Sequence, residues 1–143
     1  MTLVAAVVRL LTIADLHERA DPRELSVTAR HEAVLDDGRH VVLLDDRGWT
    51  EGLRGAGEDT DIWQGVSESH IAETARVVVG PDEPFGGGTQ RDMEESHWSW
   101  LAGKLAADGV AVEAAALRRL PHDVVLGDRL RARLGSTGLI GPA

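Results

Sequence analysis

Apolar and polar positions alternate along residues 25–46, LSVTARHEAVLDDGRHVVLLDD, which is typical of two half-buried strands. Between the two runs lies Asp37-Gly38, a dipeptide that tolerates the positive φ values of a two-residue hairpin turn. We therefore predict a β-hairpin over this segment. The pairs expected to lie opposite one another are Leu35 and His40, Ala33 and Val42, and His31 and Leu44.

The apolar run at residues 3–13, LVAAVVRLLTI, fits two kinds of element. Val7, Val8 and Ile13 favour extended structure, whereas the spacing of Leu3, Val7 and Leu10 also fits one face of a helix. A third strand is the preferred interpretation because an isolated two-stranded hairpin is marginally stable. A helix stays open as the alternative.

Helical periodicity dominates the second half of the chain, after a loop rich in glycine and acidic residues at 48–65. Ser67 and Thr89 are suited to cap helix starts, and Gly109 is suited to follow a helix end. Pro121 separates the last two helical segments, because proline disrupts a helix interior. The expected helices cover 68–79, the segment from near Thr89 to Gly109, 113–119 and 122–134.

Together these elements predict an α+β fold. The hairpin at 25–46 belongs to a small antiparallel sheet, and three or four helices pack against it. The 143 residues suffice for one core of ordinary size, so we expect a single domain at 1–135 followed by a loose tail at 136–143.

Composition and charge narrow the function classes. The chain has no cysteine, which excludes disulfides, thiolate metal sites and cysteine nucleophiles. With 24 acidic and 15 basic residues its formal charge is -9, so general nucleic-acid binding is disfavoured. The apolar opening is too short to span a membrane and does not resemble a signal peptide, so we expect a cytoplasmic protein without membrane contact. Homo-oligomer formation is compatible with the sequence.

Residues 84–100, PFGGGTQRDMEESHWSW, combine three glycines, a helix start, a histidine and two tryptophans. Glycines before a helix N-terminus could cradle an anion. However, the stretch lacks the lysine of a phosphate-binding loop and meets an acid at Asp92. A connection leading into a capped helix is therefore the preferred interpretation.

The candidate catalytic residues in this stretch are His97 and Glu94, with Asp82 or Glu83 from the preceding loop. A histidine near carboxylates could act as a general base. No nucleophile-elbow motif accompanies these residues. The six histidines also lack a compact metal-binding spacing, so we expect no metal site and no cofactor.

Trp98 and Trp100 cannot share one narrow helix face, because they are two positions apart. Trp98 continues an apolar stripe with Leu101, Ala102 and Leu105, which leaves Trp100 on a neighbouring face with Met93 and His97. A wide buried face is the preferred interpretation. The alternative is an exposed Trp100 that anchors a protein partner.

The sequence thus favours a small acidic intracellular protein-binding or regulatory domain, whose partner has a basic surface. The alternative is a small enzyme or ligand-binding domain with its site in residues 82–100. The residues expected to contact a partner are Trp49, Asp59, Asp61, Trp63 and Trp100.

Overall fold

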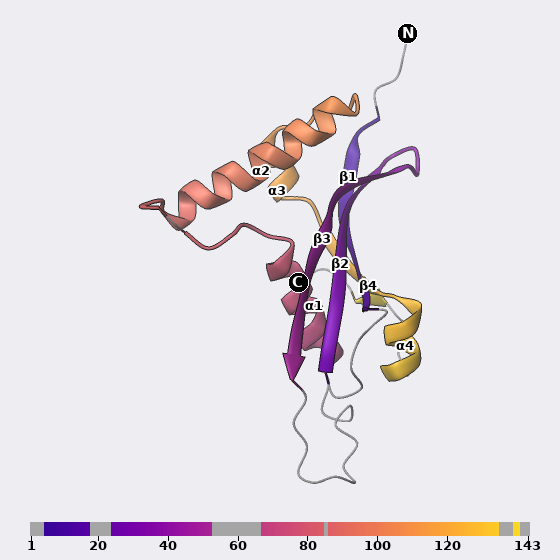
Figure 1. Cartoon of the computed structure of the whole chain (residues 1–143). Coiled ribbons are helices and arrows are strands. Elements are labelled where there is room, and N and C mark those ends of the chain that lie inside the picture. Colours follow the sequence, from indigo (N-terminus) through magenta and orange to yellow (C-terminus); the bar gives the residue numbers. More distant parts are fainter. Residues whose placement is uncertain (1–4, 18–23, 53–66, 85, 135–138, 141–143) are drawn as a thin grey trace, which may run out of the picture.

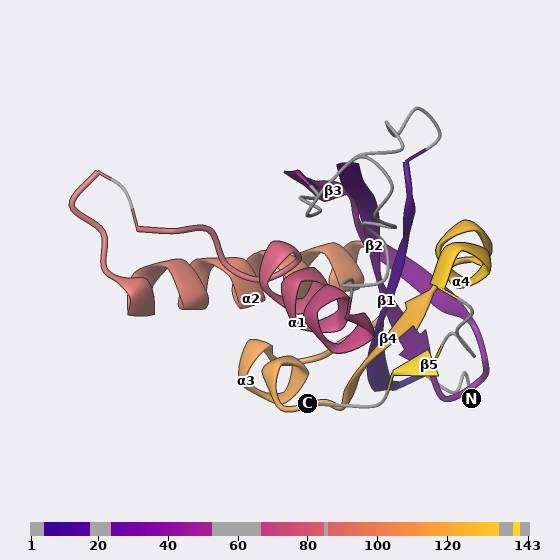
Figure 2. The same ribbon diagram turned by 90° about the horizontal axis from the view of Figure 1, so that it is seen from below.

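The computed structural model describes residues 5–17, 24–52, 67–84, 86–134 and 139–140. These residues form an α+β fold, with one mixed sheet in the order β3-β2-β1-β4-β5 (Figure 1). The strands are β1 (Val7–Leu16), β2 (Glu24–Leu35), β3 (His40–Gly52), β4 (His122–Leu126) and β5 (Leu139–Ile140). The helices are α1 (Glu68–Val78), α2 (Gln90–Ala107), α3 (Ala114–Arg118) and α4 (Asp128–Leu134). Figure 2 shows α1, α2 and α3 on one side of the sheet, and α4 on the other side of β1 and β4.

The hairpin of β2 and β3 is confirmed, but its turn is one residue longer than predicted. The Leu35 amide donates to the Arg39 carbonyl at 2.8 Å, which leaves a three-residue loop ending at Gly38 with φ 87°. Consequently Val34 lies opposite His40, so the predicted partners near the turn are wrong by one position. The predicted partners His31 and Leu44 do lie opposite one another, because the register shifts between His31 and Glu32.

The sheet is not purely antiparallel, because β4 pairs in parallel with β1. The prediction of one helix over 122–134 is wrong: its first half is β4, and only residues 128–134 form a helix. The β-branched Val124 and Val125 favour extended structure, and Val124 is fully buried against the sheet. Gly127 separates strand from helix at a place where a Cβ atom would collide with the side chain of Asp15.

The other predicted elements can be compared directly. The preferred interpretation of the segment at 3–13 is confirmed from residue 7 on, where the segment forms the first part of β1; residues 5 and 6 are described but belong to no strand. Ser67 and Thr89 cap α1 and α2, and Thr89 shares a capping box with Asp92. Within the predicted loose tail at 136–143, Leu139 and Ile140 form β5 and pair with β4. The other residues of this tail lie outside the described residues.

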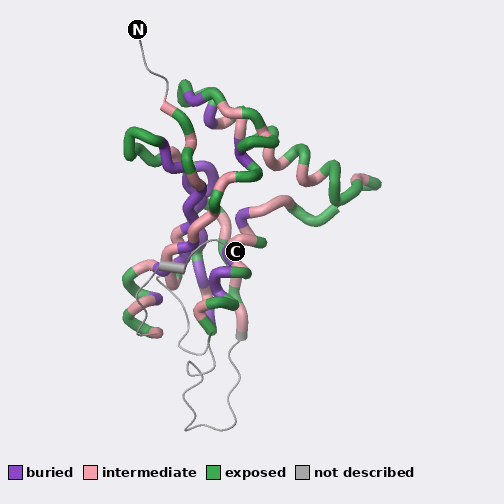
Figure 3. Tube along the Cα trace, turned by 180° about the vertical axis from the view of Figure 1, so that it is seen from behind, coloured by how far each residue is buried: buried purple, intermediate pink, exposed green. Residues whose placement is uncertain are grey.

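The core lies between the sheet and the helices in two adjoining clusters. One contains Leu101 and Leu105 of α2, and the other contains Ile71 of α1. These two leucines are the buried residues of α2, whose first half is largely exposed and projects from the body (Figure 3). Among the described residues, no helix is both long enough and apolar enough to cross a bilayer.

Candidate binding groove

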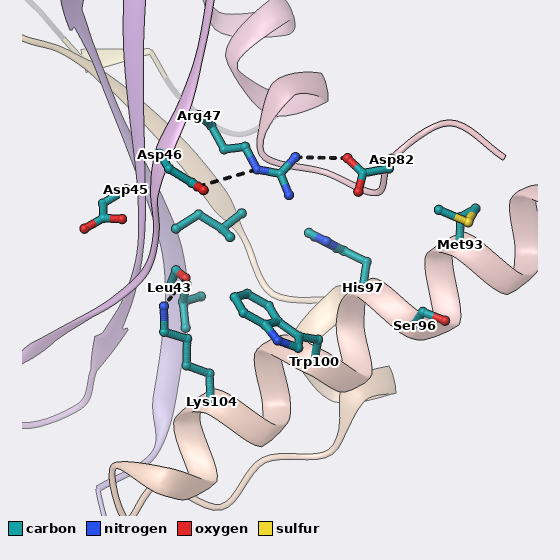
Figure 4. A pocket seen from close by; sticks show the side chains of 11 residues that line it. Leu43, Asp45, Asp46, Arg47, Asp82, Met93, Ser96, His97, Trp100 and Lys104 are labelled. Atoms are coloured by element: carbon teal, nitrogen blue, oxygen red, sulfur yellow. Dashed lines mark hydrogen bonds and ion pairs between the residues drawn. The ribbon is translucent and has the colours of Figure 1, made fainter. Parts of the chain in front are cut away.

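A groove of about 500 Å³ lies where the projecting part of α2 diverges from β3 (Figure 4). One wall is a stretch of β3, the second is one face of α2, and the third is the connection between α1 and α2. The lining residues are Leu43, Leu44, Asp45, Asp46, Arg47, Asp82, Met93, Ser96, His97, Trp100 and Lys104. β3 lies at the edge of the sheet, so the groove adjoins a strand that has a sheet neighbour on one side only.

Two irregularities in strand pairing shape the β3 wall. The register shifts between Ala29 and His31 and again between His31 and Glu32, opposite the part of β3 that lines the groove. In a regular strand neighbouring side chains point to opposite faces, whereas here Leu43 and Leu44 are both buried. Bulges of this kind redirect side chains and are frequent beside functional sites. The irregular pairing therefore gives the groove wall two consecutive buried leucines, where a regular strand would turn one of them to the opposite face.

The α2 wall is a stripe of residues with helical spacing. Met93, His97, Trp100 and Lys104 follow one another at intervals of three or four, so they share one face of the helix. Trp100 is 54% exposed, one of the largest exposures of an apolar side chain in the described structure. The Lys104 ammonium lies 5.2 Å from the centre of the Trp100 ring and donates a hydrogen bond of 2.7 Å to the Leu43 carbonyl. Trp100 thus offers apolar surface in the groove beside a cation of the same chain.

The end of the groove nearest α1 is charged. The Arg47 guanidinium lies 3.2 Å from an Asp82 carboxylate oxygen and 3.8 Å from an Asp46 carboxylate oxygen. Arg47 also donates to the Val78 carbonyl at 3.3 Å, which fixes the guanidinium at this end. Asp45 adds a third exposed carboxylate to the lining. The acids of the groove outnumber its two permanently charged cations.

His97 points from α2 toward the charged end (Figure 4). Burial lowers the pKa of His97, the positive charge of Arg47 lowers it further, and Asp82 opposes this effect. The imidazole is therefore neutral at pH 7. Its ring also meets the Trp98 ring edge to face at 5.1 Å between centroids.

The structure separates the two candidate catalytic residues. Glu94 faces away from the groove and pairs with Arg118 at 3.0 Å. Glu94 lines a different cavity, of about 530 Å³, between α2 and the α3 region. Of the two loop acids considered, Asp82 lines the groove with His97, and Glu83 does not. The structure thus brings together His97 and Asp82 rather than His97 and Glu94.

Of the five residues expected to contact a partner, the structure describes two, Trp49 and Trp100. Trp100 lies in the groove, and its exposure contradicts the preferred expectation of a wide buried face. Trp98 does pack against the core with Leu101 and Leu105, as predicted. Trp49 is half-buried and packs against both core clusters. The remaining three, Asp59, Asp61 and Trp63, lie outside the described residues.

Sequence reasoning missed Arg47 and Lys104 as parts of this site. Lys104 is the only lysine of the chain and follows Trp100 by four positions. On a helix this spacing brings two side chains together, so it was a usable signal for a cation beside an aromatic ring. No comparable signal exists for Arg47, because it meets Asp82 only through the tertiary fold.

A second polar cluster lies inside the core. The Thr12 hydroxyl forms hydrogen bonds with His31 Nδ1 at 3.0 Å and His122 Nε2 at 2.6 Å. Burial, assisted by the charges of His122 and His97, lowers the pKa of His31 to about 3. Burial and the charge of Arg76 lower the pKa of His122 to about 4, although Asp123 opposes this. Both rings are therefore neutral members of a buried hydrogen-bond network at pH 7.

Within the described part of the chain, no three histidine, aspartate or glutamate side chains gather closely enough to hold a metal ion. Comparisons with protein families, curated proteins and solved structures find no match to this chain. The function is therefore inferred from the geometry and charge of the groove.

Proposed function

We propose that this chain is a small acidic protein-binding or regulatory domain, and that the groove between β3 and α2 receives a segment of a basic partner. The observation that carries the proposal is the exposed Trp100 ring in a groove with excess carboxylates. Aromatic rings anchor protein interfaces because they bury a large area at little cost in rotamer freedom. A cytoplasmic location and homo-oligomer formation remain part of the proposal as expectations.

Charge supports a basic partner. The chain carries a formal charge of -9, so it attracts cationic proteins at a distance. In the groove, Asp45, Asp46 and Asp82 add negative charge to the walls that also hold Trp100. Long-range attraction and local contacts thus favour the same class of partner.

The dimensions favour a short extended segment. Residues 43–47 of β3 span about 13 Å in extended conformation. The α2 face from Met93 to Lys104 spans about 16 Å. A partner segment of about four or five extended residues matches both lengths, with apolar side chains against Trp100 and Leu44, and cationic side chains near Asp46 and Asp82.

Photocrosslinking with a peptide probe tests the proposal. A benzophenone amino acid replaces Ser96 in the groove or, as the matched control, Ser99 on the cavity that Glu94 lines. The probe is a biotinylated peptide of alternating arginine and valine, and its control has glutamate in place of arginine. We expect strong labelling only at position 96 with the arginine peptide. Equal labelling at both positions, or none at position 96, would contradict the proposal.

A ligand-binding or enzymatic function in the same groove is the second candidate. It is favoured by the lowered pKa of His97, because a neutral imidazole beside Asp82 can accept a proton. The test is a screen of ester and phosphate-ester substrates with the wild type and His97→Gln. Turnover that His97→Gln removes while Glu94→Gln retains it would support this candidate. Turnover unaffected by His97→Gln would reject it.

A further inference from the structure

We infer that Lys104 occupies, in the unbound protein, the place on the Trp100 ring that an arginine side chain of the partner takes on binding. The inference rests on the proposed function and deepens it, because it names the side chain that the groove recognises. Its central observation is that the groove already holds a cation on its exposed aromatic ring.

The position of Lys104 shows what chemistry this part of the groove accepts. Its ammonium lies 5.2 Å from the Trp100 ring centre, within the range of cation–π attraction. Trp100 nevertheless remains 54% exposed, so an arriving group can reach the ring from solvent. The ring therefore attracts cations and is accessible to those of a partner.

Displacing Lys104 from the ring requires little rearrangement. The ammonium ends a flexible four-carbon chain and also donates to the Leu43 carbonyl at 2.7 Å. It can keep that hydrogen bond or exchange it for water while it moves off the ring. Lys104 thus shields the ring and the edge of β3 without closing the groove.

An arginine side chain fits the groove better than a lysine side chain. A planar guanidinium can stack on an indole ring and pair with a carboxylate at the same time, whereas an ammonium acts as a point charge. Asp46 and Asp82 line the same groove as Trp100, and they share one guanidinium, that of Arg47, between them. Their remaining acceptor capacity is available to a second guanidinium.

The uniqueness of Lys104 allows a direct measurement. Reductive methylation with ¹³C-formaldehyde labels Lys104 and the N-terminal amine, keeps the charge of Lys104, and gives a methyl NMR signal sensitive to the Trp100 ring current. The Lys104→Arg variant identifies the N-terminal signal. The probes are acetyl-arginine amide and its uncharged counterpart acetyl-citrulline amide.

We expect acetyl-arginine amide to move the Lys104 methyl signal toward its value in Trp100→Leu, where the ring is missing. Acetyl-citrulline amide should leave the signal in place. Equal responses to both probes, or no response to the arginine probe, would overturn the inference.

A pair of charge-matched variants tests whether Lys104 and the arginine probe compete for the Trp100 ring. Lys104→Gln should raise the affinity for acetyl-arginine amide about two- to fivefold, which corresponds to the loss of one competing cation–π contact. Arg91→Gln makes the same charge change on the exposed surface of α2, where Arg91 pairs with Glu95, and should alter the affinity less. Equal effects of the two variants would show that net charge, not occupation of the ring, is responsible.

The NMR test of Lys104 and the crosslinking test of the groove have separate outcomes. Peptide labelling at position 96 without movement of the Lys104 signal would leave the proposed function intact and reject the displacement of Lys104. Movement of the signal without peptide labelling would reject a peptide-binding groove and retain arginine recognition at Trp100.

Discussion

The helix-covered face of the sheet and the groove beside it hold their polar and aromatic side chains in opposite situations. Inside the core, His31 is 1% exposed and shares the Thr12 hydroxyl with His122. In the groove, Trp100 is 54% exposed, and the ammonium of the flexible Lys104 side chain lies over its ring. One region pairs these polar side chains with one another, and the other leaves apolar and charged surface accessible to solvent.

This difference separates residues that hold the fold from residues that can bind. A buried polar network contributes to a unique packing arrangement when all its members have partners. An exposed tryptophan contributes little to folding, and in the proposed function Trp100 is the residue that contacts the partner. The helix α2 contains both kinds of residue, at the adjacent positions Trp100 and Leu101.

The largest expected effect is on stability, from a change in the core. Leu101 is fully buried and joins α2 to the sheet. Leu101→Ala should lower the free energy of unfolding by about 2–5 kcal/mol, because it removes apolar contacts and leaves a cavity. Urea denaturation measures this change. A loss below about 1 kcal/mol would contradict the assignment of Leu101 to the core.

Acidification should also destabilise the core. His31 and His122 have pKa values of about 3 and about 4 in the folded protein, below the unfolded value of about 6.5. As the pH falls below 6.5, the unfolded chain binds protons that the folded protein does not. The free energy of unfolding should therefore fall by about 1.4 kcal/mol per pH unit for each histidine.

Urea denaturation between pH 7.5 and pH 5 measures this dependence, above the range in which most carboxylates titrate. His70→Gln is the control, because His70 is exposed and pairs with Glu51 at the surface. The dependence should persist in that variant. A free energy of unfolding that stays constant over this range would contradict the buried neutral pair.

A smaller loss is expected from the hydroxyl that joins the two histidines. Thr12→Val keeps the shape of the side chain but removes the hydrogen bonds to His31 and His122. The expected loss is about 1–3 kcal/mol, because buried polar atoms lose their partner. Thr50→Val removes an exposed hydrogen bond to Ser26 and should change stability by at most about 0.5 kcal/mol. Similar losses in both variants would remove the distinction between core and surface.

Local signals in the sequence predicted much of the fold. The hairpin, the caps at Ser67 and Thr89, and the stop at Gly109 depend on nearby residues, and the structure confirms them. The strand at 122–126 was missed because its partner is β1, more than 100 residues earlier in the chain. The short apolar run there fits a helix as well as a buried strand, and pairing with β1 decides between them.

The candidate site was predictable only along one helix. Helical spacing correctly placed Trp100 beside Met93 and His97, and away from the stripe of Trp98. The exposure of Trp100 depends on the direction in which α2 leaves the sheet, which the sequence pattern does not contain. The contribution of Arg47 depends on register shifts in β3, which arise from strand pairing.

The affinity of the groove for the arginine–valine peptide, measured by calorimetry with the wild type and Trp100→Ala, tests the central claim most directly. Trp100→Ala should change the free energy of unfolding by about 1 kcal/mol or less, since the ring is more exposed than buried. It should weaken peptide binding about tenfold or more, as expected for an aromatic anchor. Unchanged affinity in this folded variant would contradict the claim that the groove binds through Trp100.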